Sequence, residues 1–301
     1  MYLNNAKLSL SPKWLYIIVP TLFFAFAGLN FLVSLLFDTS SLIKAEIASK
    51  GELMYLTENL LIFAVFLAVL LLWVKYVHRQ PLTALITARP KIDWRRFWFA
   101  FALWGVVTVG VTLIDYAIHP EAYVWNFQWM PFLKLLVIVV LMMPLQTGFE
   151  EVFFRAYLMQ GVGLTVRNAW LPLVFTSVTF GLMHLANPEV EKLGYMLLIY
   201  YIGTGFFLGI TTLMDDGIEL ALGFHTANNL FTALLVTSDW TVFQVPSLLC
   251  DVSEPTLGLT LWVPLLICFP LMLYIYAKKY HWKDIKKHLI TLDKNKKELL
   301  H

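Results

Sequence analysis

The sequence predicts an all-α protein, a polytopic membrane bundle of about eight transmembrane helices, and two observations support this prediction. Of the 301 residues, 59% are hydrophobic and only 14% are charged, whereas soluble domains have roughly 45–50% apolar and about 25% charged residues. Apolar runs of about 20 residues, long enough to cross a hydrocarbon layer as helices, recur along the whole chain. A soluble fold has no means of burying so much apolar surface.

The expected spans follow one another with short polar breaks, and no soluble domain or internal repeat separates them. The stretch around Phe26 resembles a signal-peptide cleavage site, but the hydrophobic run continues to Phe37, which favours a retained span. We expect one transmembrane domain over residues 1–277 and a basic cytoplasmic tail over 278–301. The eight spans are expected near residues 15–37, 53–76, 97–118, 131–160, 169–187, 193–214, 218–237 and 257–277.

The distribution of Lys and Arg predicts the orientation, since cytoplasmic loops keep the positive charge. With eight spans and both termini inside, 18 of the 22 Lys and Arg residues lie on the inner side, and Lys44, Lys50, Lys134 and Lys192 remain outside. We therefore expect an integral, multi-pass membrane protein with both termini in the cytoplasm. Its surroundings are the lipid bilayer, and no nucleic-acid partner is expected.

The basic tail has two interpretations. Trp282, Ile285, Leu289 and Leu292 fall at helical spacing on one face, which suits a helix lying on an anionic leaflet. The alternative is a flank that stops transfer of the last span and carries a solvated helix. This second interpretation is the simpler one.

Three ionisable residues end the fourth expected span, namely Glu150, Glu151 and Arg155. A charge that faces lipid at mid-depth costs about 2.5–3.5 kcal/mol on insertion scales, so these side chains must face the bundle, a wet cavity or the inner interface. Glu151 and Arg155 are spaced i, i+4 with the acid first, the favourable order for an ion pair that holds the helix. Glu150 points about 100° away around the helix and is left as a candidate base or ligand.

Two later spans carry histidines among apolar residues. His184 is expected on the fifth span, an apolar helix that closes at Asn187, and a lone histidine there is more often a packing residue than a catalyst. His225 and Asn229 share one face of the seventh span at i, i+4 spacing, where hydrogen bonds between helices are a second explanation. Because Glu150, Glu151 and Arg155 also lie within an apolar span, a shared functional site explains these polar residues better than coincidence.

This set of side chains suits the attack of water on a carbonyl group. Glu150 is expected to hold and deprotonate the water, with His184 sharing or relaying the proton. His225 and Asn229, both hydrogen-bond donors, are expected to stabilise the oxyanion of the tetrahedral intermediate. Glu150, His184 and His225 are alternatively candidate zinc ligands, and the sequence does not decide between these two kinds of site.

Other intramembrane hydrolase patterns are missing, because the chain contains no HExxH and no GxSxG. Asp215 and Asp216 fall in an expected turn and are interpreted as loop residues. Two interpretations without hydrolysis stay open: an immunity or scaffold protein that keeps the cluster as a structural polar network, and a proton-coupled transporter. Transport is the weaker, because the two halves lack a matched pair of Gly/Pro-broken spans. We interpret Gly205 and Gly209 as sites of close helix packing.

The order of three motifs resembles a known family. The motifs are EExxxR in Glu150-Glu151-Val-Phe-Phe-Arg155, FxxxH in Phe180-Gly-Leu-Met-His184 and HxxxN in His225-Thr-Ala-Asn-Asn229. Each lies on a separate late span, which resembles the CPBP intramembrane proteases, a family that includes CAAX prenyl endopeptidases and Abi-type proteins of bacteriocin processing and self-immunity. The resemblance covers roughly residues 145–230.

The resemblance implies a membrane endopeptidase that acts on a peptide or protein substrate at the membrane. In it, Glu150 and His184 activate water, and His225 and Asn229 form the oxyanion site. The family is commonly named a metalloprotease, yet a glutamate-activated water does not require a metal. The sequence therefore does not decide whether zinc is a cofactor.

Overall fold

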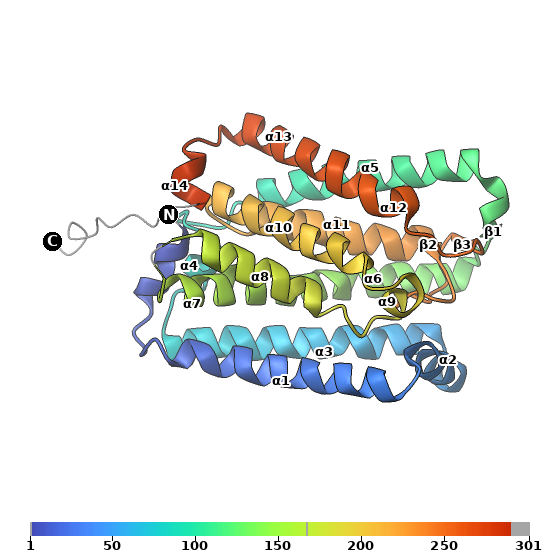
Figure 1. The fold of residues 1–301 in the computed structure, drawn as a ribbon, viewed down its shortest axis with the longest axis horizontal. Helices are drawn as coiled ribbons and strands as arrows, with labels where there is room; N and C mark the ends of the chain where they lie inside the picture. Colours follow the sequence, from blue (N-terminus) through green and yellow to red (C-terminus); the bar gives the residue numbers. More distant parts are fainter. Residues whose placement is uncertain (1, 167, 290–301) are drawn as a thin grey trace.

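The computed structural model describes residues 2–166 and 168–289, and it confirms an all-α membrane bundle. Long helices lie side by side along one axis of the molecule (Figure 1). Two of the predicted spans hold shorter helices, α8 (Trp170–Leu182) and α11 (Glu219–Leu235). Six of the described helices are long and apolar enough to cross a membrane: Leu15–Leu36, Glu52–His78, Trp94–Ile118, Trp129–Gly163, Leu197–Asp215 and Leu261–Tyr280.

Several of these long helices are built from more than one segment. The fourth comprises α6 (Trp129–Glu151), a π-helical stretch η4 (Val152–Leu158) and α7 (Met159–Gly163). The others are α1 (Leu15–Leu36), α3 (Glu52–Leu72) with the π-helical η2 (Trp73–His78), α5 (Trp94–Ile118), α10 (Leu197–Asp215), and α12 (Gly258–Val263) continued by η5 (Pro264–Cys268) and α13 (Phe269–Tyr280). The last helix thus includes the first three residues of the predicted tail.

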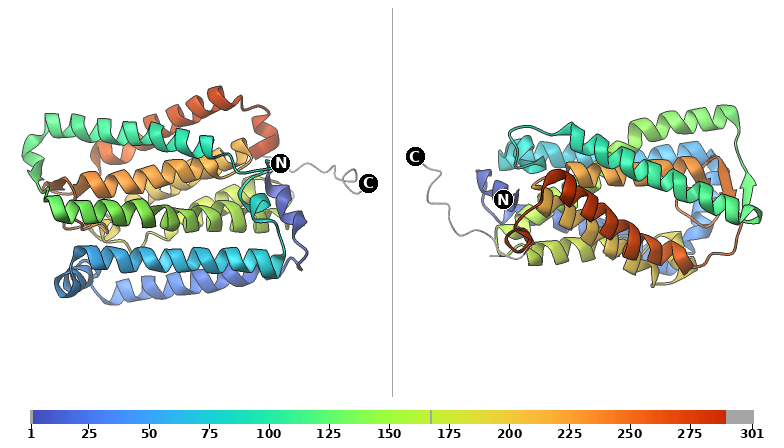
Figure 2. Two further views of the ribbon diagram at one scale, coloured as in Figure 1. Left: turned by 180° about the vertical axis from the view of Figure 1, so that it is seen from behind. Right: turned by 90° about the horizontal axis from the view of Figure 1, so that it is seen from above.

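Short elements close the two ends of the bundle (Figures 1 and 2). One end carries η1 (Tyr2–Leu8), α4 (Leu82–Ile86) and α14 (Ile285–Leu289). The other end carries α2 (Thr39–Lys50), η3 (Pro120–Ala122), α9 (Pro188–Leu193) and a small sheet. In this sheet β3 (Leu249–Asp251) lies between β1 (Tyr123–Trp125), which is antiparallel to it, and β2 (Val236–Thr237), which is parallel.

Both ends of the described chain lie at the same end of the bundle. Asp216 Oδ1 accepts a hydrogen bond from the backbone N–H of Tyr2 at 2.7 Å, and Asp216 Oδ2 lies 3.5 Å from His288 Nε2. That this end faces the cytoplasm stays a prediction, as does the division into a membrane domain and a tail. Arg167 and residues 290–301, which contributed to both predictions, lie outside the described residues.

Glycines allow the helices around the site to approach closely. A Cβ atom added at Gly205 of α10 would lie 2.6 Å from the backbone oxygen of Ser177 in α8, and one at Gly209 would meet the Leu173 side chain at 2.5 Å. The predicted close packing at these two glycines is confirmed. Small residues serve this purpose in membranes because lipid supplies no hydrophobic drive for helices to associate, so close van der Waals contact must hold them together.

The prediction that Asp215 is a loop residue is wrong. It is the last residue of α10, is only 5% exposed, and pairs with Arg89 at 3.4 Å and with Arg96. The indole N–H of Trp282 also donates to its carboxylate at 3.1 Å. These partners come from distant parts of the chain and compensate for the burial of the charge. Asp216 does lie in a turn, with a left-handed backbone.

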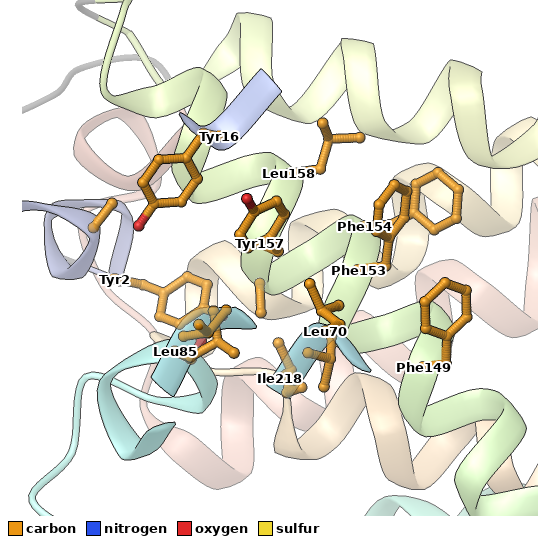
Figure 3. Close-up of a cluster of buried hydrophobic side chains, with 14 of the residues drawn as sticks. Tyr2, Tyr16, Leu70, Leu85, Phe149, Phe153, Phe154, Tyr157, Leu158 and Ile218 are labelled. Carbon is orange, nitrogen blue, oxygen red and sulfur yellow. The ribbon is translucent and has the colours of Figure 1, made fainter. Parts of the chain in front are cut away.

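Buried aromatic side chains gather around the junction of α6 and η4 (Figure 3). Phe149 stacks on Phe153 at a centroid distance of 5.6 Å, and Phe153 meets Phe154 edge to face at 4.9 Å. Phe149 also packs against Phe23 of α1 and Phe66 of α3. Because these rings occupy the α1 and α3 side of the helix, its acidic residues are left to face α11.

Candidate active site

The site is built around the junction of α6 and η4. Glu150 and Glu151 are the last two residues of α6, and Arg155 lies in the π-helical stretch that follows. A π-helical turn inside an α-helix is frequent at functional sites. The two carboxyl groups are therefore presented at an irregular point in an otherwise continuous membrane helix.

Glu151 and Arg155 form the predicted ion pair inside the protein. The Arg155 Nη1–H donates to Glu151 Oε1 at 3.0 Å, and both side chains are 0% exposed. The same Glu151 oxygen accepts from His225 Nδ1 at 2.7 Å. Glu151 therefore orients a predicted site histidine as well as holding the helix, a contact that the sequence did not predict.

Glu150 takes no part in the Arg155 pair, as the helix geometry predicted. Its Oε1 accepts a hydrogen bond from Gln146 Nε2 at 2.6 Å, and its Oε2 lies 3.4 Å from His225 Nε2. The Glu150 side chain is 13% exposed, whereas Glu151 is fully enclosed. Of the two acids, only Glu150 is accessible to a water or a substrate.

His225 lies between the two acids and connects them. Its Nδ1 must donate to Glu151, because a carboxylate only accepts, and its Nε2 faces Glu150. With this imidazole protonated, the two glutamates, Arg155 and His225 sum to zero net charge. Neutral groupings of this kind are the least costly way to bury ionised groups.

Asn229 reaches the same point from α11, on the face it shares with His225. Its Nδ2 donates to Gln146 Oε1 at 3.0 Å. Gln146, which is 7% exposed, thus bridges Asn229 and Glu150. Gln146 was not predicted from the sequence, although its position one helical turn before Glu150 was a usable signal.

His184 stands apart from the other predicted residues. The prediction that it lies on a helix closing at Asn187 is wrong, because α8 ends at Leu182 and His184 lies in the turn that follows. Its Nδ1 donates to the backbone oxygen of Phe180 at 3.0 Å, which leaves the Nε2 lone pair of the neutral ring free. Among the described residues, no hydrogen bond or ion pair joins His184 to Glu150 or to His225.

Aromatic rings link His184 to the rest of the site. Its imidazole stacks on the Tyr201 ring at 3.9 Å with an interplanar angle of 14°. The Phe180 ring meets His184 at 5.1 Å and His225 at 6.0 Å, both edge to face. Arg155 lies over the same Phe180 ring at 4.0 Å. Tyr201 carried no sequence signal, because its contact with His184 depends on how α10 packs.

The candidate zinc ligands do not fit a metal site. Within the described part of the chain, no three His, Cys, Asp or Glu residues are arranged to hold a metal ion. Both nitrogens of His225 face carboxylates, and His184 uses Nδ1 on a backbone carbonyl. A zinc ligand set of Glu150, His184 and His225 would need these contacts to be replaced.

Comparisons with known proteins agree with the location of these motifs. Residues 129–231 match the family described as type II CAAX prenyl endopeptidase Rce1-like. The chain is also 34% identical, over 200 residues, to the uncharacterized protein YyaK of Bacillus subtilis, and the match covers 65% of each protein. The chain thus spans slightly less than two thirds of this relative's length. No solved structure matches it. Residues 129–231 contain all three motifs, and over this part of the chain the resemblance to the CPBP proteases is confirmed.

Proposed function

We propose that the protein is an intramembrane endopeptidase that hydrolyses a peptide bond of a membrane-associated substrate by a glutamate-activated water. The observation that carries this proposal is the partly exposed Glu150 carboxylate, which faces His225 directly and is linked to Asn229 through Gln146. The enclosed pair of Glu151 and Arg155 supports it, because it supplies fixed charges that orient the reacting groups. The match of residues 129–231 to the Rce1-like family supports the same chemistry.

The reaction starts with a water molecule held by Glu150. Each oxygen of this carboxylate has one neighbour and keeps a further lone pair for the water. Glu150 takes a proton from the water as the water oxygen bonds to the substrate carbonyl carbon, and the carbonyl electron pair moves onto its oxygen. When this oxyanion collapses, the C–N bond breaks, and the proton on Glu150 passes to the leaving nitrogen.

Donors for the oxyanion come from α11. Asn229 uses one N–H of its side-chain amide on Gln146 and has a second for the substrate. Protonated His225 carries an N–H on Nε2, on the side that faces Glu150. Fixed donors of this kind each contribute substantially to rate because they need no reorganisation during the reaction.

His184 has a second, supporting role in the proposal. With Nδ1 bound to the Phe180 carbonyl, its Nε2 is the free nitrogen that shares or relays the proton of the attacking water. No step uses a metal, because the candidate ligands do not fit one. The substrate is a peptide or protein at the membrane, and cleavage of prenylated CAAX sequences is the activity that the family description suggests.

The direct test measures cleavage of membrane-tethered peptides by the purified protein in liposomes. Glu150→Ala should lower the rate by about 10²–10⁴-fold, the usual contribution of a general base. Glu121→Ala is the matched control, since Glu121 is an exposed acid in η3 at the end of the bundle that carries the sheet. Equal cleavage by wild type and Glu150→Ala would refute the mechanism.

A structural polar network is the second candidate function, as expected of a non-catalytic immunity or scaffold protein. The full enclosure of Glu151 and Arg155 favours it, because neither side chain can touch a substrate. Arg155→Ala should lower stability under both candidate functions. Glu150→Gln separates them, since it abolishes hydrolysis in an enzyme but leaves the phenotype of a scaffold intact.

A further inference from the structure

A continuous chain of side-chain hydrogen bonds leads into the proposed site from α5. The indole N–H of Trp104 donates to Asn228 Oδ1 at 3.1 Å, and Asn228 Nδ2 donates to Asn229 Oδ1 at 3.1 Å. Asn229 Nδ2 donates to Gln146 Oε1 at 3.0 Å, and Gln146 Nε2 donates to Glu150 Oε1 at 2.6 Å. The chain therefore crosses three helices and ends on the proposed base.

The direction of this chain is determined at both ends. An indole nitrogen can only donate, so Asn228 must present its oxygen to Trp104 and its amide hydrogens to Asn229. An ionised carboxylate can only accept, so Gln146 must present its nitrogen to Glu150 and its oxygen to Asn229. Each amide then has one possible orientation. Asn229, in the middle, is held with its oxygen on Asn228 and its nitrogen on Gln146.

This orientation matters because a side-chain amide turned by 180° exchanges a donor for an acceptor. Trp104 and Gln146 are each only 7% exposed, and the Trp104 ring packs on Phe224 at 4.4 Å. Hydrogen bonds are electrostatically stronger in such a low-dielectric setting, and links in a chain polarise one another. The two ends of the chain therefore fix the side of Asn229 that bears the N–H groups.

We propose that Trp104, Asn228 and Gln146 are positioning residues that keep the second N–H of Asn229 directed at the oxyanion and hold the Glu150 carboxylate in place. This inference rests on the proposed endopeptidase function. Trp104 and Asn228 act only through Asn229. Gln146 contacts both Asn229 and Glu150. For this reason, we expect substitution of Gln146 to lower kcat more than substitution of Trp104 or Asn228.

The main test replaces Trp104 by Phe, which keeps an aromatic ring and removes the N–H. Loss of one net hydrogen bond should lower kcat by about 2- to 12-fold with KM unchanged. Trp98→Phe is the matched control, because Trp98 lies on the same helix but is 60% exposed. An equal kcat for Trp104→Phe and Trp98→Phe would overturn the proposal.

A double-mutant cycle separates positioning from general packing. If Trp104 acts through Asn229, then Trp104→Phe should have no further effect on kcat in an Asn229→Ala background. The same fold-loss in both backgrounds would mean that the indole affects packing alone, and the proposal would be wrong. Failure of the proposed function itself looks different, since wild type and Glu150→Ala would then cleave equally.

Asn228→Asp tests the direction of the chain without a change of shape. The new carboxylate accepts from Trp104 but cannot donate to Asn229 Oδ1, so two acceptors face each other. We expect a larger fall in kcat than for Trp104→Phe. If Trp104→Phe does not fold, this variant decides the question, and a wild-type kcat for it refutes the proposal.

Discussion

Replacement of Arg155 by Met gives the sharpest test of the charge arrangement at the site. The guanidinium and the Glu151 carboxylate are both 0% exposed, and their Nη1–Oε1 distance is 3.0 Å. Removal of one partner of a buried ion pair typically costs about 3–5 kcal/mol, because the other charge is left without compensation. Glu151 keeps the hydrogen bond from His225 at 2.7 Å, so we expect the lower part of this range.

The assay is unfolding in mixed detergent micelles, followed by tryptophan fluorescence. Glu151→Gln combined with Arg155→Met removes both charges, while the Gln oxygen still accepts from His225. The double variant should therefore be more stable than Arg155→Met alone. Lys44→Met is the matched control, since the Lys44–Asp239 pair is 54% and 77% exposed and should contribute little. If the double variant lost as much free energy of unfolding as Glu151→Gln and Arg155→Met lose together as single substitutions, the expected coupling between the two charges would be refuted.

Three further predictions concern the surroundings of the site. Tyr201→Leu removes the ring stacked on His184 and should lower kcat by about 2- to 12-fold, whereas Tyr195→Leu, a change at a ring that is 68% exposed, should have no effect. Burial raises the pKa of Glu189, which lies outside the spans. The stability it contributes is complete below the pKa of the unfolded chain and is lost as the pH rises through the folded pKa. In Glu189→Gln the new side chain still accepts from the Val242 N–H but cannot ionise. The melting temperature of this variant relative to wild type should therefore rise as the pH rises. A difference that stays the same at all pH values would contradict this. Treatment with a metal chelator should leave cleavage intact, and activity lost to the chelator but restored by zinc would show that the candidate ligands rearrange.

Local spacing predicted the contacts that a single helix controls. The i, i+4 separation placed Glu151 against Arg155 and put His225 and Asn229 on one face. The same geometry correctly directed Glu150 away from Arg155. Such contacts follow from helix periodicity alone, so they need no knowledge of the fold.

Helix periodicity could not predict contacts between different helices. The bond from Trp104 to Asn228 joins residues 124 apart, and that from Asn229 to Gln146 joins residues 83 apart. Both depend on how α5, α6 and α11 are placed in the bundle. The position of His184 was missed for another reason, because an apolar run does not reveal that the helix ends at Leu182 before a turn.

Part of the proposed site lies on a short helix that is largely enclosed by protein. α11 has 17 residues, is too short to count among the six long apolar helices, and carries His225 and Asn229. Eleven of its residues are buried, against two of the 22 residues in α1. A helix enclosed by protein does not need to satisfy lipid, so polar side chains can be placed on it at low cost. Hydropathy therefore identifies the long helices of the bundle, whereas part of the proposed active site lies on a helix that it does not identify.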